Sequence, residues 1–141
     1  MRILVIDGQG GGIGSRLAAL LRPRLPEGWE LLCAGTNALA TSAMLKAGAA
    51  RGATGEHAVI YNARRADLIL GPMGILLADG ILGEVSPEMA AAVSGAACKK
   101  ILIPSSTCGV LVAGVEERRL EDYLNGAVEL ALEEVRRLSG Q

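Results

Sequence analysis

Aromatic side chains are almost absent from this sequence: they make up 2% of its 141 residues, and phenylalanine does not occur. A surface on which the bases of a single-stranded nucleic acid stack is therefore excluded. Basic residues are not in excess either, since 14 Lys and Arg stand against 15 Asp and Glu, for a net charge of −1. Proteins that neutralise the phosphates of a nucleic acid carry a clear positive surplus. We expect no nucleic-acid partner.

Long apolar runs and paired cysteines are also lacking. No stretch approaches the roughly 20 uninterrupted apolar residues of a membrane helix, and the run Ile3–Ile6 meets Asp7 too soon for a signal peptide. We expect a cytoplasmic protein without a membrane partner. Cys33, Cys98 and Cys108 are odd in number and lack C-x-x-C spacing, which predicts neither disulfides nor a metal site. Cys33 ends an apolar run and should be buried.

Apolar residues make up 50% of the sequence, which suffices for a packed core and excludes disorder. A chain of this length suits one domain, so we expect residues 1–141 to fold as a single unit.

Short apolar runs alternate along the chain with stretches of helical spacing. This alternation predicts a single Rossmann-like α/β domain, with a mostly parallel sheet and helices on both faces. The link between the last two apolar runs is too short for a crossover, which predicts a C-terminal antiparallel strand pair. Residues 75–85 are apolar without a clear period and receive no assignment. The expected strands are 3–6, 30–34, 67–70, 101–103 and 110–115, and the expected helices are 14–22, 38–47, 54–65, 86–97 and a long one through 124–138.

The most informative stretch is Asp7–Gly14, DGQGGGIG, between the first predicted strand and the first predicted helix. Phosphates bind at such junctions because free backbone N–H groups and the positive end of the helix dipole point there, and glycines leave room for their approach. In an open parallel sheet, ligands lie beyond the carboxyl ends of the strands. Residues 73–74 and Ser105-Ser106-Thr107 belong to the same edge. The predicted ligand-binding residues are Gly8, Gln9, Gly10, Gly11, Gly12, Ile13, Gly14, Thr36, Asn37, Gly71 and Pro72.

Each of these assignments has a structural alternative. The glycines could serve only to let the helix pack closely on the strand, although such a dense run is entropically more costly than packing usually requires. Asp7 either binds Mg²⁺ together with phosphates or accepts backbone N–H bonds within the turn. Asn37 either contacts a ligand or caps the helix that follows it. For Asp7 and Asn37 we favour the turn and cap roles.

The candidate cofactors are a nucleotide or an NADP-type dinucleotide. NAD is not supported, because Ala34-Gly35-Thr36 stands about 20 residues beyond the glycines, where an acidic residue would bind the ribose. NADP would need a basic residue, for which Arg16 is the nearby candidate.

Two known families have similar glycine turns. The spacing Gly8-x-x-x-Gly12-x-Gly14 resembles the T-G-x-x-x-G-I-G turn of the short-chain dehydrogenase/reductase family, which implies a Rossmann fold. That family's catalytic Tyr-x-x-x-Lys is echoed by Tyr61–Arg65, but arginine does not deprotonate, so the chemistry does not carry over. Residues Gly10–Arg16 resemble the deviant P-loop of ParA/MinD-type ATPases without its lysines and its magnesium-binding hydroxyl, which argues against ATP hydrolysis.

Over most of its length the sequence resembles a small uncharacterised bacterial family, a domain of unknown function. The resemblance implies a shared fold and no known chemistry. It is carried by Ile6–Gly14, Gly35–Asn37, Thr41–Ala49, Gly52–Glu56, Tyr61-Asn62, Gly71-Pro72 and Lys100–Pro104.

We therefore predict a protein that binds a phosphate-bearing small molecule, a nucleotide or dinucleotide, at the glycine turn. The alternative is an oligomeric scaffold or regulatory partner protein without a small ligand, in which Ile75–Val85 forms the subunit interface. A homo-oligomer is expected under either hypothesis. No acid–base pair supports a catalytic assignment, and whether the protein is an enzyme is left open.

Overall fold

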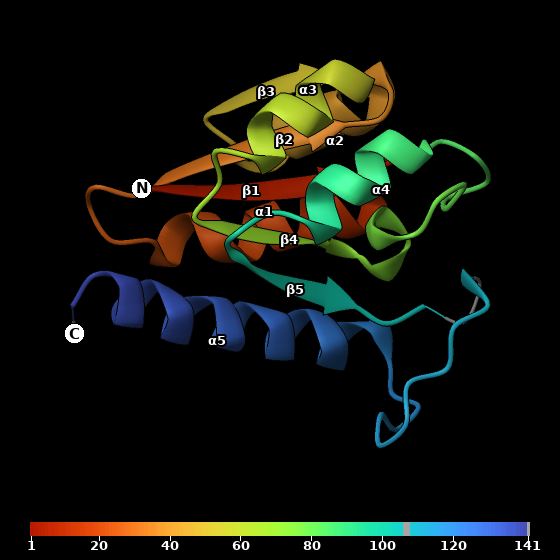
Figure 1. Ribbon diagram of the computed structural model, residues 1–141. Coiled ribbons are helices and arrows are strands. Elements are labelled where there is room, and N and C mark those ends of the chain that lie inside the picture. Colours follow the sequence, from red (N-terminus) through yellow and green to blue (C-terminus); the bar gives the residue numbers. More distant parts are fainter. Residues whose placement is uncertain (106–107, 141) are drawn as a thin grey trace.

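A five-stranded parallel sheet forms the middle layer of the computed structural model, which describes residues 1–105 and 108–140 (Figure 1). The central strand β1 (Arg2–Asp7) pairs with β2 (Glu30–Gly35) on one side and with β4 (Leu68–Pro72) on the other. The edge strands are β3 (Arg51–Thr54), beside β2, and β5 (Lys99–Ile103), beside β4. The order β3-β2-β1-β4-β5 is that of a Rossmann-like sheet.

Helices cover both faces of the sheet, as predicted for a mostly parallel sheet. Short 3-10 turns follow the first helix and the fourth strand. One face bears α1 (Gly12–Leu21), α2 (Ala38–Ala47) and α5 (Leu120–Leu138). The other face bears α3 (Glu56–Ala63) and α4 (Pro87–Ser94). The 3-10 turns are η1 (Arg22–Arg24) and η2 (Met73–Leu76).

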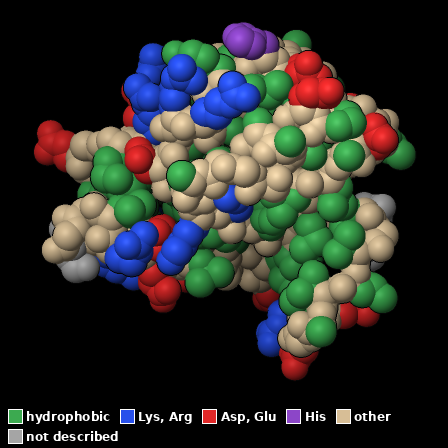
Figure 2. Space-filling model, in the orientation of Figure 1, with side chains coloured by type: hydrophobic (Ala, Val, Ile, Leu, Met, Phe, Trp, Pro, Cys, Tyr) green, Lys and Arg blue, Asp and Glu red, His purple; other side chains and the backbone are tan. Residues whose placement is uncertain are grey.

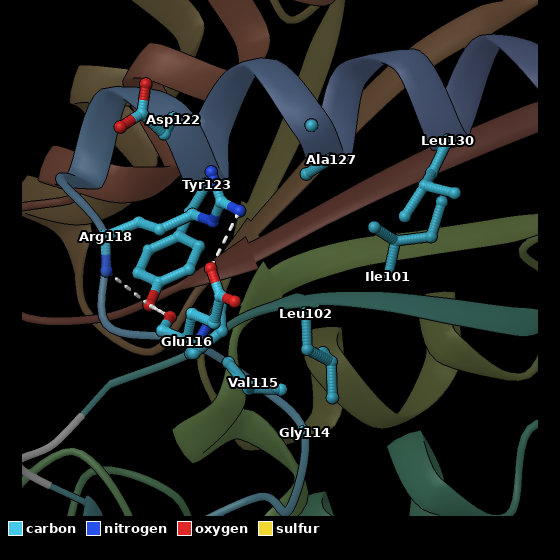
Figure 3. Close-up of a pocket in the computed structure, with 12 residues that line it drawn as sticks. Ile101, Leu102, Gly114, Val115, Glu116, Arg118, Asp122, Tyr123, Ala127 and Leu130 are labelled. Carbon is cyan, nitrogen blue, oxygen red and sulfur yellow. Dashed lines mark hydrogen bonds and ion pairs between the residues drawn. The ribbon is translucent and has the colours of Figure 1, made fainter.

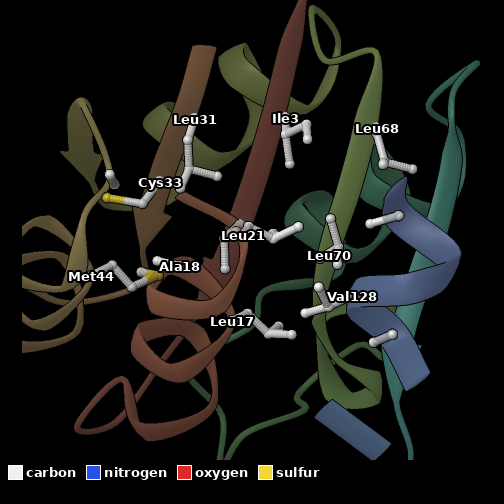
Figure 4. Close-up of a cluster of buried hydrophobic side chains, with 14 of the residues drawn as sticks. Ile3, Leu17, Ala18, Leu21, Leu31, Cys33, Met44, Leu68, Leu70 and Val128 are labelled. Carbon is white, nitrogen blue, oxygen red and sulfur yellow. The ribbon is translucent and has the colours of Figure 1, made fainter. Parts of the chain in front are cut away.

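Two layers of apolar side chains join the sheet to these helices. Ile3 and Val5 of β1 belong to the layer against α1, α2 and α5, part of which is drawn in Figure 4. Leu4 and Ile6 belong to the layer against α3 and α4. Because both faces of the strand are buried, residues Ile3–Ile6 of β1 are all apolar, and a continuous apolar run rather than an alternating pattern marks the strand in the sequence.

Helix α2 begins and ends at the residues that the sequence predicts. The side-chain oxygen of Asn37 accepts the amide N–H of Ala40 at 2.9 Å, which is an N-cap. At the other end, Gly48 has a φ of 137°, a conformation that favours glycine and stops the helix. The cap role for Asn37 is confirmed.

The predicted antiparallel strand pair is wrong. Residues 110–119 contain no strand, and among the described residues β5 pairs with β4 alone. Gly109 and Gly114 have φ values of 73° and 85°, left-handed conformations that turn the chain from an extended path. The segment has to leave the sheet edge because it leads to α5, on the face that also bears α1. Leu111 is consequently 95% exposed.

Strand β3 and residues 75–85 depart from the expectations in other ways. Strand β3 was not predicted, because an edge strand that is mostly exposed needs no apolar run. Both ends of the segment 75–85 are buried within the chain, since Ile75 and Val85 are each 1% exposed and pack with α4. These two side chains therefore contribute to the chain's own core and cannot form a subunit interface.

Candidate ligand-binding site

The glycine turn lies where the sheet changes its direction of growth. From β1 the chain builds β2 and β3 on one side, then crosses through α3 to β4 on the other side of β1. The loops after β1 and β4 therefore diverge, which creates the crevice where open parallel sheets bind ligands. A cavity of about 470 Å³ lies at this place. It is lined by Asp7, Gly8, Gln9, Gly10, Gly12, Ile13, Pro72, Gly74, Ile81, Leu82, Ser105 and Cys108.

Asp7 ends β1 and is 5% exposed. One carboxylate oxygen accepts the amide N–H of Gly8 at 2.8 Å, and the other accepts that of Gly14, in the first turn of α1, at 2.6 Å. Burial raises the pKa of Asp7 and the nearby Glu84 carboxylate adds to the rise, whereas the bonds from Gly14 and Gly8 oppose it. The structure thus places Asp7 in the turn role, with its carboxylate at the positive end of the helix dipole.

Glu84, from the loop between η2 and α4, is a second carboxylate at the turn. Its Oε1 accepts the amide N–H of Gln9 at 3.0 Å, the hydroxyl of Thr36 at 2.5 Å and the side-chain N–H of Asn37 at 2.8 Å. The bond from Thr36, followed by those from Gln9 and Asn37, lowers the pKa of Glu84. Three predicted ligand-binding residues are therefore bound to a carboxylate of the protein itself.

Packing accounts for some glycines of the turn. A Cβ at Gly14 would lie 2.6 Å from Met44 Sδ and 2.8 Å from Asp7 Cβ. A Cβ at Gly8 would lie 2.7 Å from the Thr36 hydroxyl. These glycines are needed because the start of α1 and the neighbouring loops approach β1 closely.

Gly10 and Gly12 are different. A Cβ at either position would meet no heavy atom within 4 Å, and neither residue has a left-handed φ. Both line the cavity, and their amides have no acceptor among the residues that the structure describes. Neither packing nor backbone conformation requires glycine here, so the two positions provide unobstructed access to backbone amides.

The surroundings of the cavity carry negative charge. No Lys or Arg of the described chain lines it. Arg16, the candidate partner for a phosphate of NADP, instead forms an ion pair with Glu121 of α5 at 3.6 Å. The positive charge near the cavity is the partial charge of the backbone amides at the start of α1, and the Asp7 carboxylate neutralises part of it. A highly charged anion in the cavity therefore faces the Asp7 carboxylate, with that of Glu84 close to the turn, and no Lys or Arg among the described lining residues.

Comparison with models of protein families shows which family the chain belongs to. The model described as a domain of unknown function (DUF3842) matches residues 2–136. The chain belongs to the DUF3842 family. The expected membership in an uncharacterised family is thereby confirmed. A search of curated proteins finds no match to this DUF3842 chain.

The solved structures similar to the DUF3842 chain include two that match nearly all of it. One is a dodecameric FMN-dependent UbiX-like decarboxylase from Escherichia coli O157:H7, with 18% identity and a TM-score of 0.49 over 100% of this chain and 95% of that one. The other is AibC, with 15% identity and a TM-score of 0.49 over 95% of this chain and 40% of that one. Sequence identities and TM-scores this low give no information about a ligand, a reaction or an assembly of this chain.

The structure brings only part of the predicted site together. At Gly71 a Cβ would collide with the backbone oxygen of Ile6, so close packing between β4 and β1 requires glycine there. Ser105 lines the cavity, whereas Ser106 and Thr107 lie outside the described residues. The predicted residues that line the cavity are Gly8, Gln9, Gly10, Gly12, Ile13 and Pro72, and those that do not line it are Gly11, Gly14, Thr36, Asn37 and Gly71.

The segment 77–86 contributes residues that the sequence analysis missed. Ile81 and Leu82 line the cavity, and Glu84 binds the glycine turn. The one signal in the sequence for a site residue here was the acidic Glu84 within the apolar stretch 75–85, which has no clear periodicity. Its partner could not be found from spacing, because 75 positions separate Glu84 from Gln9 along the chain.

The cysteines differ in burial. Cys33 is buried as predicted, and burial raises its pKa to about 11. Cys108 is half-buried at the cavity, and its thiol donates to the backbone oxygen of Ser105 at 2.9 Å. Within residues 1–105 and 108–140, no three His, Cys, Asp or Glu side chains are grouped to hold a metal ion. No helix in the described part of the chain is both long and apolar enough to span a bilayer.

A second hollow of about 670 Å³ lies between β5 and α5, and we call it the β5–α5 groove (Figure 3). Ile101 of β5 and Leu130 of α5 form part of its apolar lining. At one end, the Tyr123 hydroxyl donates to the backbone oxygen of Glu116 at 2.5 Å and accepts the amide N–H of Arg118 at 3.0 Å. Figure 2 shows apolar side chains gathered on this side of the molecule. No predicted site residue lines the groove.

Proposed function

We propose that this protein binds a phosphate-bearing small molecule, a nucleotide or dinucleotide, in the cavity at the glycine turn. The observation that carries the proposal is that Gly10 and Gly12 line this cavity and that neither packing nor φ requires glycine there. Amides at the start of a helix are well suited to phosphate because the helix dipole acts in the same direction. The volume of about 470 Å³ lies within the roughly 300–1,000 Å³ typical of small-molecule sites.

The charges around the turn favour a ligand of low negative charge. Asp7 and Glu84 would repel a triphosphate, and the described lining offers no Lys or Arg to offset that repulsion. With Arg16 paired to Glu121, the extra phosphate of NADP also lacks an evident partner. A nucleoside monophosphate, or a dinucleotide whose phosphates are diesters, fits these charges better.

Isothermal titration calorimetry tests the proposal with AMP, FMN, NAD, NADP, ATP, GTP and cyclic dinucleotides. We expect a monophosphate or dinucleotide to bind, and AMP to bind about tenfold more tightly than ATP if adenine is the base, a difference of about 1.4 kcal/mol. The absence of binding across the panel would overturn the proposal.

A pair of glycine variants locates the site. Gly12→Val places a branched side chain at the cavity, so we expect it to weaken binding at least about tenfold without lowering the melting temperature. Gly126→Val is the control for binding at the turn, since Gly126 is also helical and also has open space at its Cβ but lies in α5, at the β5–α5 groove, so its oligomeric state is compared with that of the wild type. Equal affinity in both variants would exclude a ligand at the glycine turn.

The second candidate function is that of an oligomeric scaffold or regulatory partner protein. The observation that favours it is the apolar surface of the β5–α5 groove, where Val115 is 46% and Leu130 is 56% exposed. Light scattering with and without nucleotide separates the candidates. An oligomer that binds no ligand would support the scaffold, whereas a complex that forms or changes with nucleotide would support the binding function.

A further inference from the structure

The segment 77–86, which we call the strap, crosses beside the glycine turn with an unusual backbone. Asp79, Ile81 and Leu82 have φ values of 63°, 54° and 51°, in the left-handed region that residues with a Cβ rarely adopt. For the β-branched Ile81 this conformation is a clear outlier. Such backbone strain persists only where surrounding contacts enforce it.

The contacts that hold the strap come from two sources. Its own backbone closes on itself, with the amide of Asp79 donating to Val85 at 2.7 Å and that of Val85 donating to Gly80 at 3.1 Å. The other source is Glu84, whose Oε1 accepts donors from Gln9, Thr36 and Asn37. The first of these donors belongs to the glycine turn and the other two to the junction of β2 and α2. Glu84 therefore ties the strap to the edge of the sheet where ligands bind.

The group that receives these donors is a carboxylate oxygen. One backbone N–H, one hydroxyl and one amide N–H converge on it at 3.0, 2.5 and 2.8 Å. An oxygen of a phosphate is likewise anionic and accepts hydrogen bonds from the same kinds of donor. It cannot bind there together with Glu84, because both would need the same donors and two anions in contact repel each other.

We propose that Glu84 is an intramolecular substitute for the anionic group of the ligand, so that ligand binding displaces Glu84 from Gln9, Thr36 and Asn37 and releases the strap. This inference rests on the proposed function, whose regulation it supplies. The strap then reduces apparent affinity, because only the fraction of molecules with Glu84 displaced can bind. Thr36 and Asn37, which do not line the cavity while Glu84 is bound, become ligand contacts once it leaves.

The test compares the full-length protein with Glu84→Ala, using inorganic phosphate as the probe and the amide resonances of Gln9 and Thr36 as the readout. We expect phosphate to bind the variant at least about tenfold more tightly than the wild type. Hydrogen exchange within residues 77–86 should also be faster in the variant. Glu88→Ala, which removes the same charge from the exposed start of α4, should leave both readouts unchanged. Glu84→Gln provides the same comparison if the alanine variant fails to fold.

A second substitution decides whether the vacated donors hold the phosphate. Adding Thr36→Val to Glu84→Ala keeps the side-chain shape but removes the hydroxyl, so the gained affinity should be lost. If Glu84→Ala binds phosphate no more tightly than the wild type, Glu84 only braces the loop and the inference is wrong. If nucleotides bind equally to the wild type and Glu84→Ala, the inference fails while the proposed function stands. If phosphate binds the variant but no nucleotide binds either protein, the proposed function fails instead.

Discussion

The two carboxylates at the glycine turn, Asp7 and Glu84, have pKa values shifted in opposite directions because their surroundings differ. Asp7 and Glu84 each accept hydrogen bonds that stabilise the charged form. Asp7 is so deeply buried that desolvation outweighs these bonds and raises its pKa, whereas half-buried Glu84 has its pKa lowered by its bonds. The sequence shows both residues as acidic and could not reveal this difference, because burial is a property of the folded chain.

The raised pKa of Asp7 makes its contribution to stability depend on pH. A carboxyl group whose pKa is raised by folding stabilises fully below its unfolded value of 3.8 and loses that contribution as the pH rises through its folded value. We therefore expect the free energy of unfolding of the wild type, relative to Asp7→Asn, to fall as the pH rises from below 3.8 through the higher folded pKa. Urea denaturation across this interval measures the difference, and a relative stability that rises would contradict the burial of the charge.

The lowered pKa of Glu84 has the opposite consequence. Its contribution is fully present above the unfolded value of 4.5 and is lost as the pH falls through the lower folded value. Relative to Glu84→Gln, the wild type should therefore gain stability as the pH rises through the acidic range. The same denaturation series gives the result. A difference that does not vary with pH would mean that Gln9, Thr36 and Asn37 do not favour the charged carboxylate in solution.

At the scale of single elements, the sequence predicted best those helix and strand boundaries that are set by residues next to them in the chain. Helix α2 begins at Asn37 and ends before Gly48, because both its cap and its stop are formed by residues next to the helix. Strand β1 was recognisable because burial on both faces requires an apolar run. Strand β3 and the loop 110–119 were not, since the edge of a sheet and the path of a connection depend on elements distant in sequence.

Two glycines of α1 should respond oppositely to alanine. At Gly12 a Cβ meets open space, so Gly12→Ala should stabilise the protein by about 0.5–1 kcal/mol through lower chain entropy in the unfolded state. At Gly14 the Cβ would press on Asp7 and Met44, so Gly14→Ala should destabilise it by roughly 1–3 kcal/mol. Chemical denaturation of the two variants measures both effects. Equal stability would show that α1 does not approach β1 as closely as described.

At the scale of the whole molecule, the strand order creates the site and the sheet edge presents an apolar surface. Crossing from β3 to β4 separates the loops after β1 and β4, and the cavity lies between them. At the β5 edge, the exposed Val115 and Leu130 line the β5–α5 groove, and no element of the described chain pairs with the outer side of β5.

We expect a homo-oligomer that this apolar surface stabilises. Leu130→Asp places a charge in the groove, so it should shift the protein toward monomer in sedimentation velocity without changing the melting temperature of the monomer. Leu39→Asp is the control, since Leu39 is 68% exposed on α2, near the opposite edge of the sheet. A wild-type protein that sediments as a monomer at all concentrations would refute the expectation.

The order of residues alone determined the features that depend on neighbours in the chain: the buried strands, the helix caps and a turn dense in glycine between β1 and α1. Only the tertiary structure decided which glycines are required by packing and which lie open, because each would-be Cβ meets atoms from distant elements such as Met44 or none at all. It also decided that Glu84 contacts Gln9, since the energy of that contact exists only after the sheet has brought the two loops together.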